Sequence, residues 1–123
     1  MIENFEEITQ DLTEVELRYA SFIALELMKH LRPGVTIKQP ELCKLINGGL
    51  VARYGLFNQM KINNVRLRKY FNYFRSKGQL PIIATSDGCS ISYDPDIIRS
   101  QIHSLEQRAR SILLAANGMK TFV

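Results

Sequence analysis

Hydrophobic residues recur at helical spacing over residues 13–31, near the start of the chain. Thr13 lies three positions before Glu16, the spacing of a capping box, in which each side chain accepts a hydrogen bond from the other residue's backbone. Leu12 and Leu17 flank this cap at the positions of a hydrophobic staple. Apolar residues then cover much of the helical circumference until a Pro-Gly pair at residues 33–34. We therefore predict one long, central packing helix.

A second, shorter helix is predicted after an extended segment at residues 35–37. Pro40 suits its first turn, and the apolar residues Leu42, Leu45 and Ile46 recur at helical spacing. We expect this helix to end after about two turns, at Asn47-Gly48-Gly49, because Asn and Gly favour helix termination. Residues 48–62 show no clear hydrophobic period. We predict that they form a connection, which can include a short helical turn.

Residues 61–78 combine an apolar arc with six positive charges and no negative one. Asn63 or Asn64 can cap a helix here, and Gly78 is its expected end. At 100° per residue, one arc of the helix holds Leu67, Tyr70, Phe71, Phe74 and Gly78. The opposite side holds Val65, Arg66, Lys69, Tyr73 and Ser76. The segment is therefore predicted to bury one face and to display a basic face that also carries an aromatic residue.

Two short β-rich runs, residues 81–85 and 89–93, follow this basic helix. They flank Ser86-Asp87-Gly88, which predicts a hairpin turn with Gly available for positive φ. A last helix is predicted over residues 94–118, with Asp94 as its cap and Pro95 at its first position.

The last helix carries an apolar seam at alternating steps of four and three residues. The seam consists of Ile98, Ile102, Leu105, Ala109, Ile112 and Ala116. Two uses of it remain open: it packs back on the domain, or it forms a homodimer. We favour the first, because about two to three heptads are short for an independent coiled coil.

The order of these elements predicts a mainly α domain with a small β-hairpin, a winged helix-turn-helix with an additional long C-terminal helix. A chain of 123 residues suffices for one such domain. We assign residues 1–12 to an acidic, flexible segment, residues 13–93 to the winged-helix domain and residues 94–118 to the C-terminal helix. In a winged helix the third helix lies in the DNA major groove, and the hairpin, or wing, contacts phosphates or the adjacent groove.

Charge is concentrated on the elements that such a domain presents to DNA. Residues 1–16 contain six acidic and no basic residues, whereas residues 29–86 contain eleven basic residues and one acid, Glu41. Solvated surfaces normally mix both signs, so this imbalance favours an anionic partner, which we predict to be duplex DNA.

The residues expected to contact DNA lie on the third helix and around it. The reading flank comprises Asn63, Asn64, Arg66, Lys69 and Tyr73. Arg can pair with guanine and Asn with adenine, so this flank is suited to base readout. Contacts to the DNA backbone are predicted for Lys77, Lys38, Thr85 and Ser86. Arg68 and Arg75 lie on the other flank, where they either pair with an acid such as Glu14 or Glu16 or hold phosphates.

Two runs, LRKYFNYFRSKGQLPIIATSDGCSIS and DPDIIRSQIHSLEQRARSIL, contain a wider pattern. The matching positions are Arg68, Phe71, Asn72, Arg75, Gly78, Pro81, Ile82, Gly88, Ser104, Leu105 and Arg108. This pattern resembles that of small winged helix-turn-helix DNA-binding proteins of bacterial phages and mobile elements. The resemblance implies DNA binding by a replication or regulatory accessory factor. Where that family usually has an aromatic residue after the wing glycine, this chain has Cys89-Ser90.

Catalytic chemistry is not indicated by the sequence. Cys43, Cys89, His30 and His103 have no metal-ligand spacing, and we predict no catalytic residue, no metal, no cofactor and no enzymatic activity. The two cysteines are expected to be reduced packing residues. The chain start lacks the order of a signal peptide and no apolar stretch is long enough for a membrane span, so we expect a cytoplasmic location. The alternative function is a protein interaction or dimerisation module on a winged-helix scaffold.

Overall fold

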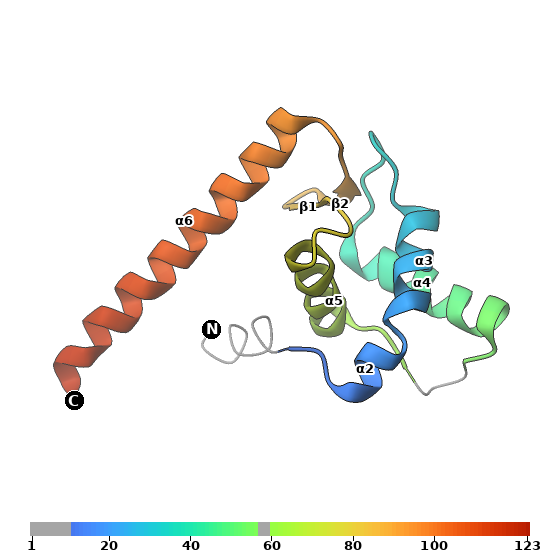
Figure 1. Cartoon of the computed structure of the whole chain (residues 1–123), viewed down its shortest axis with the longest axis horizontal. Coiled ribbons are helices and arrows are strands. Elements are labelled where there is room, and N and C mark those ends of the chain that lie inside the picture. The colour runs from blue at the N-terminus through green and yellow to red at the C-terminus, as the bar shows by residue number, and fades with distance from the viewer. Residues whose placement is uncertain (1–10, 57–59) are drawn as a thin grey trace. The chain divides into compact units, whose positions relative to one another are not determined.

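A computed structural model describes residues 11–56 and 60–123 (Figure 1). Its elements are α2 (Glu14–Arg18), α3 (Ala20–His30), α4 (Gln39–Tyr54), α5 (Asn64–Ser76), β1 (Ile82–Thr85), β2 (Gly88–Ile91), α6 (Pro95–Met119) and the 3-10 helix η1 (Lys120–Phe122). The described chain is mainly helical with a small two-stranded antiparallel sheet, as predicted. It divides into two units, residues 1–92 and 93–123. The predicted flexible segment, residues 1–12, lies outside the described residues except for Asp11 and the buried Leu12.

The predicted helix over residues 13–31 is divided in two at Tyr19. The capping box that begins α2 is confirmed: Thr13 Oγ1 accepts from the Glu16 backbone N–H at 3.2 Å, and Glu16 Oε1 accepts from the Thr13 N–H at 2.9 Å. Tyr19 then leaves the helical region, with φ of −99° and ψ of 3°. The Glu16 carbonyl oxygen accepts the Tyr70 hydroxyl at 2.6 Å and the Tyr19 backbone N–H at 3.2 Å. In an uninterrupted helix that oxygen would serve the N–H four residues later.

Helix α4 is longer than its sequence predicted. It continues through Asn47-Gly48-Gly49 to Tyr54 and ends at Gly55, whose φ of 66° is left-handed. The predicted helix end at residues 47–49 was therefore wrong. The predicted connection over residues 48–62 was wrong for residues 48–54, which are helical, and residues 57–59 lie outside the described residues. At Gly49 an added Cβ would lie 1.8 Å from Oε1 of Glu26 on α3, whereas at Gly48 it would meet nothing within 4 Å. Gly49 thus permits close packing of α3 on α4 instead of ending the helix.

Helix α5 and the hairpin agree with the prediction. Asn63 caps α5 through its side-chain oxygen, which accepts the Arg66 N–H at 2.8 Å. Strands β1 and β2 pair antiparallel from Ile82 opposite Ile91 to Thr85 opposite Gly88.

The predicted extended segment, residues 35–37, joins this hairpin. Ile37 and Cys89 exchange two backbone hydrogen bonds, of 2.8 and 2.7 Å. This bridge fixes the start of α4 against β2.

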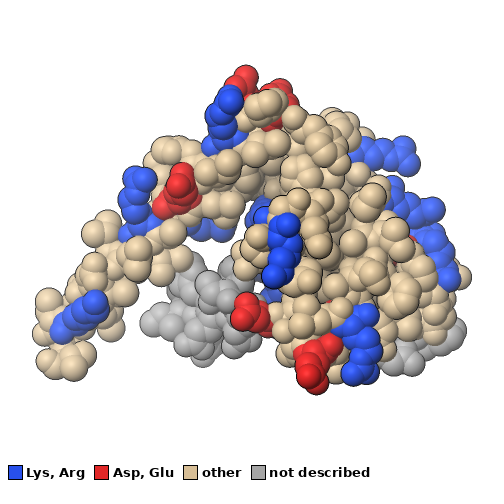
Figure 2. All heavy atoms as spheres, in the orientation of Figure 1, with Lys and Arg blue, Asp and Glu red and all other residues tan. Residues whose placement is uncertain are grey.

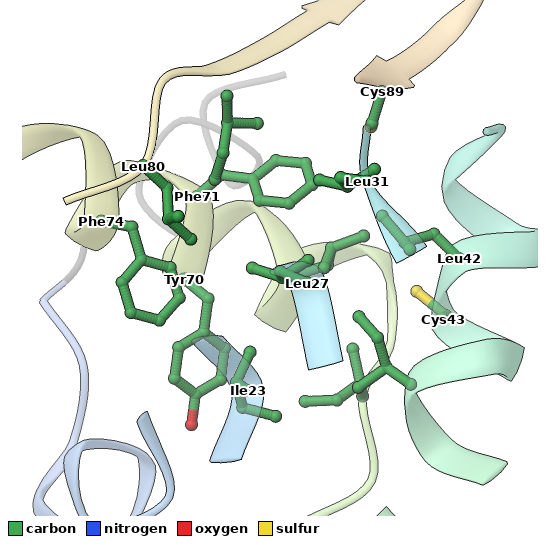
Figure 3. Close-up of a cluster of buried hydrophobic side chains, with 14 of the residues drawn as sticks. Ile23, Leu27, Leu31, Leu42, Cys43, Tyr70, Phe71, Phe74, Leu80 and Cys89 are labelled. Atoms are coloured by element: carbon green, nitrogen blue, oxygen red, sulfur yellow. The ribbon is translucent and has the colours of Figure 1, made fainter. Parts of the chain in front are cut away.

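One hydrophobic core holds α3, α4, α5 and the hairpin together. Helix α5 contributes Tyr70, Phe71 and Phe74, whose side chains lie close to the Ile23 and Leu27 side chains of α3 (Figure 3). All five are at most 1% exposed. The apolar arc predicted for α5 is therefore the face that packs in the core.

Helix α6 belongs to the second unit. Asp94 caps it by accepting the Asp96 N–H at 2.9 Å, and Pro95 occupies the first helical position, as predicted. The helix extends to Met119, one residue beyond the predicted end, and none of its residues is buried. Among the described residues, no helix is long and apolar enough to cross a membrane.

The contact between α3 and α4 predicts opposite effects for two neighbouring glycines. Gly49→Ala should destabilise the protein by about 2 kcal/mol, because its methyl group would displace the Glu26 carboxylate from a packed contact. Gly48→Ala should stabilise it by about 0.5 to 1 kcal/mol, because alanine favours the helix and has open space there. Urea unfolding of both variants measures the difference, and equal stabilities would contradict the close packing at Gly49.

Candidate nucleic-acid interface

A buried carboxylate, Glu16, lies between α2 and the basic helix α5. The residue is 2% exposed. Its Oε2 accepts from Arg66 Nε at 2.8 Å, and its Oε1 accepts from Lys69 Nζ at 2.7 Å. With the Thr13 backbone N–H, two side-chain cations and one amide serve this single carboxylate.

These contacts keep Glu16 ionised. Burial alone would raise its pKa, but the hydrogen bonds from Lys69, from the Thr13 backbone and from Arg66 outweigh burial and lower the pKa to about 2. The neighbouring Tyr70 hydroxyl responds in the opposite direction: burial and the Glu16 charge both raise its pKa. Tyr70 therefore stays protonated and serves as the donor to the Glu16 carbonyl oxygen.

The ion pairs with Glu16 determine where the predicted reading flank lies. Arg66 and Lys69 face α2, with side chains that are 36% and 10% exposed. The sequence had left open whether Arg68 and Arg75 pair with an acid such as Glu14 or Glu16 or hold phosphates. The described partners of the Glu16 carboxylate are Arg66, Lys69 and the Thr13 backbone N–H. Lys69 is too enclosed to be a surface contact. Arg66 and Lys69 therefore connect α5 to α2 through Glu16.

Two other residues predicted on that flank, Asn63 and Tyr73, are also engaged within the protein, whereas the third, Asn64, is exposed on the opposite flank. The Asn63 side chain caps α5. Tyr73 is half-buried, and Lys77 Nζ lies 5.9 Å from the centre of its ring. A pocket of about 570 Å³ is lined by Leu17 of α2, by Asp11, by α5 residues that include Lys69 and Tyr73, and by Lys77, the C-cap of α5.

The opposite flank of α5 carries Asn64, Arg68 and Arg75. Arg75 Nε donates to the Ile82 carbonyl at 3.0 Å, which connects α5 to β1. Asn64 is exposed, and its side-chain oxygen lies 3.6 Å from the Cys43 sulfur of α4. The Nε of Arg68 is buried and has no hydrogen-bond partner in the described part of the chain. This arginine is half-buried and near enough to Cys43 to influence it electrostatically.

Both cysteines are free and buried, as predicted for packing residues. Burial raises the pKa of the Cys43 thiol, and the charge of Arg68 opposes this shift. Burial likewise raises the pKa of Cys89, and the charge of Arg75 acts against it. Cys43 lies on α4 and Cys89 on β2, so the arginine flank of α5 lies between the start of α4 and the hairpin.

The start of α4 and the tip of the hairpin complete this side of the unit. Lys38 is exposed at the N-cap of α4, and its backbone nitrogen is 3.1 Å from the position of an added Cβ at Gly88. Thr85 and Ser86 are exposed at the hairpin end. We call Lys38, Asn64, Arg68, Arg75, Thr85 and Ser86 the open surface.

Basic and acidic side chains are distributed differently over the first unit. Figure 2 shows basic side chains at several points of this unit, whereas the acidic side chains in view lie near α2. The cluster that neutralises Arg66 and Lys69 contains Glu16 of α2, whereas Arg68 lies near Cys43 of α4.

Within residues 11–56 and 60–123 there is no group of three or more His, Cys, Asp or Glu residues placed to hold a metal ion. His30 lies on α3 with Nε2 3.6 Å from the Glu26 carboxylate, and Glu26 also pairs with Arg53. The arrangement offers hydrogen-bond donors and positive charge, which suit the binding of an anionic polymer.

Comparisons of the chain with protein-family models, with curated proteins and with solved structures find no match. The resemblance to phage and mobile-element proteins therefore stays a prediction from the sequence.

The Glu16 cluster predicts a strong effect of removing one charge. Glu16→Gln should destabilise the protein by about 3 kcal/mol, because it leaves Arg66 and Lys69 without their buried counter-charge. Glu14→Gln is the matched control: Glu14 is an exposed acid in the same helical turn and should change stability by less than about 1 kcal/mol. Urea unfolding at neutral pH measures both.

The same carboxylate predicts the direction of a pH effect. The pKa of Glu16 is about 2 in the folded protein against an ordinary value of 4.5. Its stabilisation is therefore complete above pH 4.5 and decreases as the pH falls toward 2. The stability difference between wild type and Glu16→Gln should shrink over that interval. A difference that stays constant from neutral pH to pH 2 would contradict this role.

Proposed function

We propose that this protein binds duplex DNA through the open surface, with α5 as the reading helix and the hairpin as the wing of a winged helix-turn-helix. Three features support this interpretation. Helices α3, α4 and α5 precede the hairpin in the order that this architecture requires. The Ile37–Cys89 bridge adds an extended segment to the hairpin. Helix α5 carries Asn64, Arg68 and Arg75 on the flank next to α4 and the hairpin.

The observation that carries the proposal is the charge of Arg68 at the open surface. Residues 29–86 contain eleven basic residues and only one acid. In the described part of this region, the side-chain ion pairs involve Arg53, Arg66 and Lys69. Arg68 is half-buried and is outside these pairs. A DNA phosphate or a guanine edge would pair with its guanidinium.

The members of the open surface have complementary roles in this proposal. Arg68 and Asn64 project from the reading helix and contact base edges or phosphates. Lys38, Thr85 and Ser86 contact the DNA backbone and set the orientation of the protein on the duplex. Arg75 holds the wing against α5 through the Ile82 carbonyl and adds positive charge near the backbone.

The proposed activity is binding without catalysis. The sequence resemblance places the chain near accessory factors of phages and mobile elements, so we propose a replication or regulatory role. Selection of bound sequences from random duplexes would define the preferred site.

Arg68 is the residue whose removal should affect DNA binding most clearly. Arg68→Ala should weaken duplex binding about tenfold and reduce the slope of log affinity against log salt by about one if Arg68 holds a phosphate. Arg18→Ala is the matched control, since Arg18 is an exposed arginine on α2, outside the open surface. Fluorescence anisotropy with labelled duplex over a salt series measures both variants. Equal losses for the two variants would contradict the assigned surface.

Lys69 distinguishes this surface from the flank predicted by sequence. On the sequence interpretation, Lys69→Ala weakens DNA binding and lowers the salt slope. Because Lys69 pairs with buried Glu16, we expect Lys69→Ala to lower the unfolding free energy by about 2 kcal/mol and to leave the salt slope of the folded protein unchanged. Absence of salt-dependent binding of the wild type to duplex, single strand and RNA would overturn the proposed function.

A further inference from the structure

Two exposed lysines lie outside the open surface, near the start of α5. Lys44 is on α4, and Lys61 lies two positions before Asn63, the N-cap of α5. We call Lys44 and Lys61 the lysine pair. Neither forms an ion pair with a described residue, whereas Arg66 and Lys69 are neutralised by Glu16. The charges of the lysine pair are therefore available to a partner.

The side chain of Asn47 joins α4 to the segment that leads into α5. Its Nδ2 donates to the Ile62 carbonyl at 3.0 Å, and its Oδ1 accepts from the Ile62 N–H at 2.8 Å. The carbonyl of the preceding residue, Lys61, accepts from Arg66 Nη1 at 2.9 Å. The backbone that carries the Lys61 side chain is thus held by α4 on one side and by α5 on the other.

Lys44 lies next to this contact. It precedes Asn47 by three positions on α4, so the two side chains leave neighbouring turns on the same side of the helix. Cys43, its neighbour in the sequence, has its sulfur 3.6 Å from Asn64 Oδ1. Lys44 and Lys61 therefore approach the first residues of α5 from two different segments.

Little negative charge offsets the lysine pair. The first turn of α5 contains no acidic residue. The one acid in residues 29–86 is Glu41, which precedes Lys44 by three positions on α4, and the ion pairs of the described residues do not include it. Two unpaired cations beside Asn63 and Asn64 make a positively charged point that attracts phosphate.

The lysine pair and the hairpin meet α4 at different points along its length. Lys38 and the hairpin lie at the N-terminal end of α4, whereas Ile62 is bound at Asn47, which follows Lys38 by nine positions. At a helical rise of 1.5 Å per residue this is about 14 Å. The major groove of DNA is about 12 Å wide. One duplex can therefore contact both points across its groove.

We propose that Lys44 and Lys61 bind neighbouring phosphates of duplex DNA beside the start of α5. The DNA backbone is then held at the lysine pair as well as at the hairpin, with Asn64 and Arg68 between them. Asn47 is the positioning residue, since it holds the segment with Lys61 against α4. The inference rests on the proposed function and adds two residues to its contact surface.

The salt dependence of duplex binding tests the lysine pair. Lys44→Ala and Lys61→Ala should each weaken the binding of a labelled duplex about fivefold and lower the slope of log affinity against log salt by about one. Lys29→Ala is the matched control, because it removes an exposed lysine of α3 and should leave the slope unchanged. Changes in Lys44→Ala and Lys61→Ala that are no larger than those in Lys29→Ala would overturn the proposal.

Asn47→Ala tests the positioning role without changing the charge of the protein. The variant keeps both lysines but loses the two hydrogen bonds to Ile62, so its salt slope should fall toward that of Lys61→Ala. A purely structural role would lower stability and leave the slope as in the wild type, and that result would remove Asn47 from the proposal. Near-ultraviolet circular dichroism of buried Tyr70 verifies that each variant is folded.

The outcomes separate this inference from the proposed function. Absence of salt-dependent binding by the wild type overturns both. Weakened binding by Arg68→Ala together with wild-type slopes for Lys44→Ala and Lys61→Ala overturns the lysine pair alone. Lower slopes for Lys44→Ala and Lys61→Ala together with wild-type binding by Arg68→Ala support the lysine pair and overturn the role assigned to Arg68.

Discussion

The buried charge of Glu16 constrains how the first unit is built. A carboxylate that is 2% exposed must be paired to remain ionised, and its partners come from α5, about fifty residues later in the chain. Arg66 and Lys69 meet this requirement from one flank, while the Tyr70 hydroxyl binds the backbone carbonyl of the same residue. The rotation of α5 about its own axis is thereby fixed. Since one basic flank faces α2, the flank with Arg68 faces away from it.

A second buried carboxylate has the same role between α3 and α4. Glu26 is 1% exposed and pairs with Arg53, and the hydrogen bond from Arg53 lowers the pKa of this carboxyl. Gly49 provides the space in which that carboxylate lies. Two acids thus position four helices, and each neutralises part of the positive charge that the sequence places in this region. The net charge of a segment is therefore a poor guide to the charge available on its surface.

Local signals explain which predictions from the sequence succeeded. The Thr13 capping box, the Asn63 cap, the Asp94 cap and the hairpin each depend on residues within a few positions of one another, and each is present in the structure. The aromatic arc of α5 was also correct, because helical periodicity places it on one face.

Long-range contacts explain the errors. Gly48-Gly49 suggested a helix end, and only the approach of Glu26, more than twenty residues earlier, shows why the helix continues. The choice between the two flanks of α5 depends on Glu16, whose position in a capping box gives no signal of a pairing with Arg66. An inference from one sequence assigns residues to a face of a helix, but the packing of distant elements decides what that face contacts.

The attachment of the hairpin has a mechanical consequence. β2 is held to the segment before α4 by the two Ile37–Cys89 hydrogen bonds, and β1 is held to α5 by Arg75. β1 is thus held at the base of the hairpin, whereas β2 is held at Cys89, one residue pair from the turn, and Ser86 and Asp87 in the turn are exposed. A load applied at the turn would be transmitted to α4 through Ile37 and to α5 through Arg75. The hairpin, α4 and α5 are therefore expected to move together.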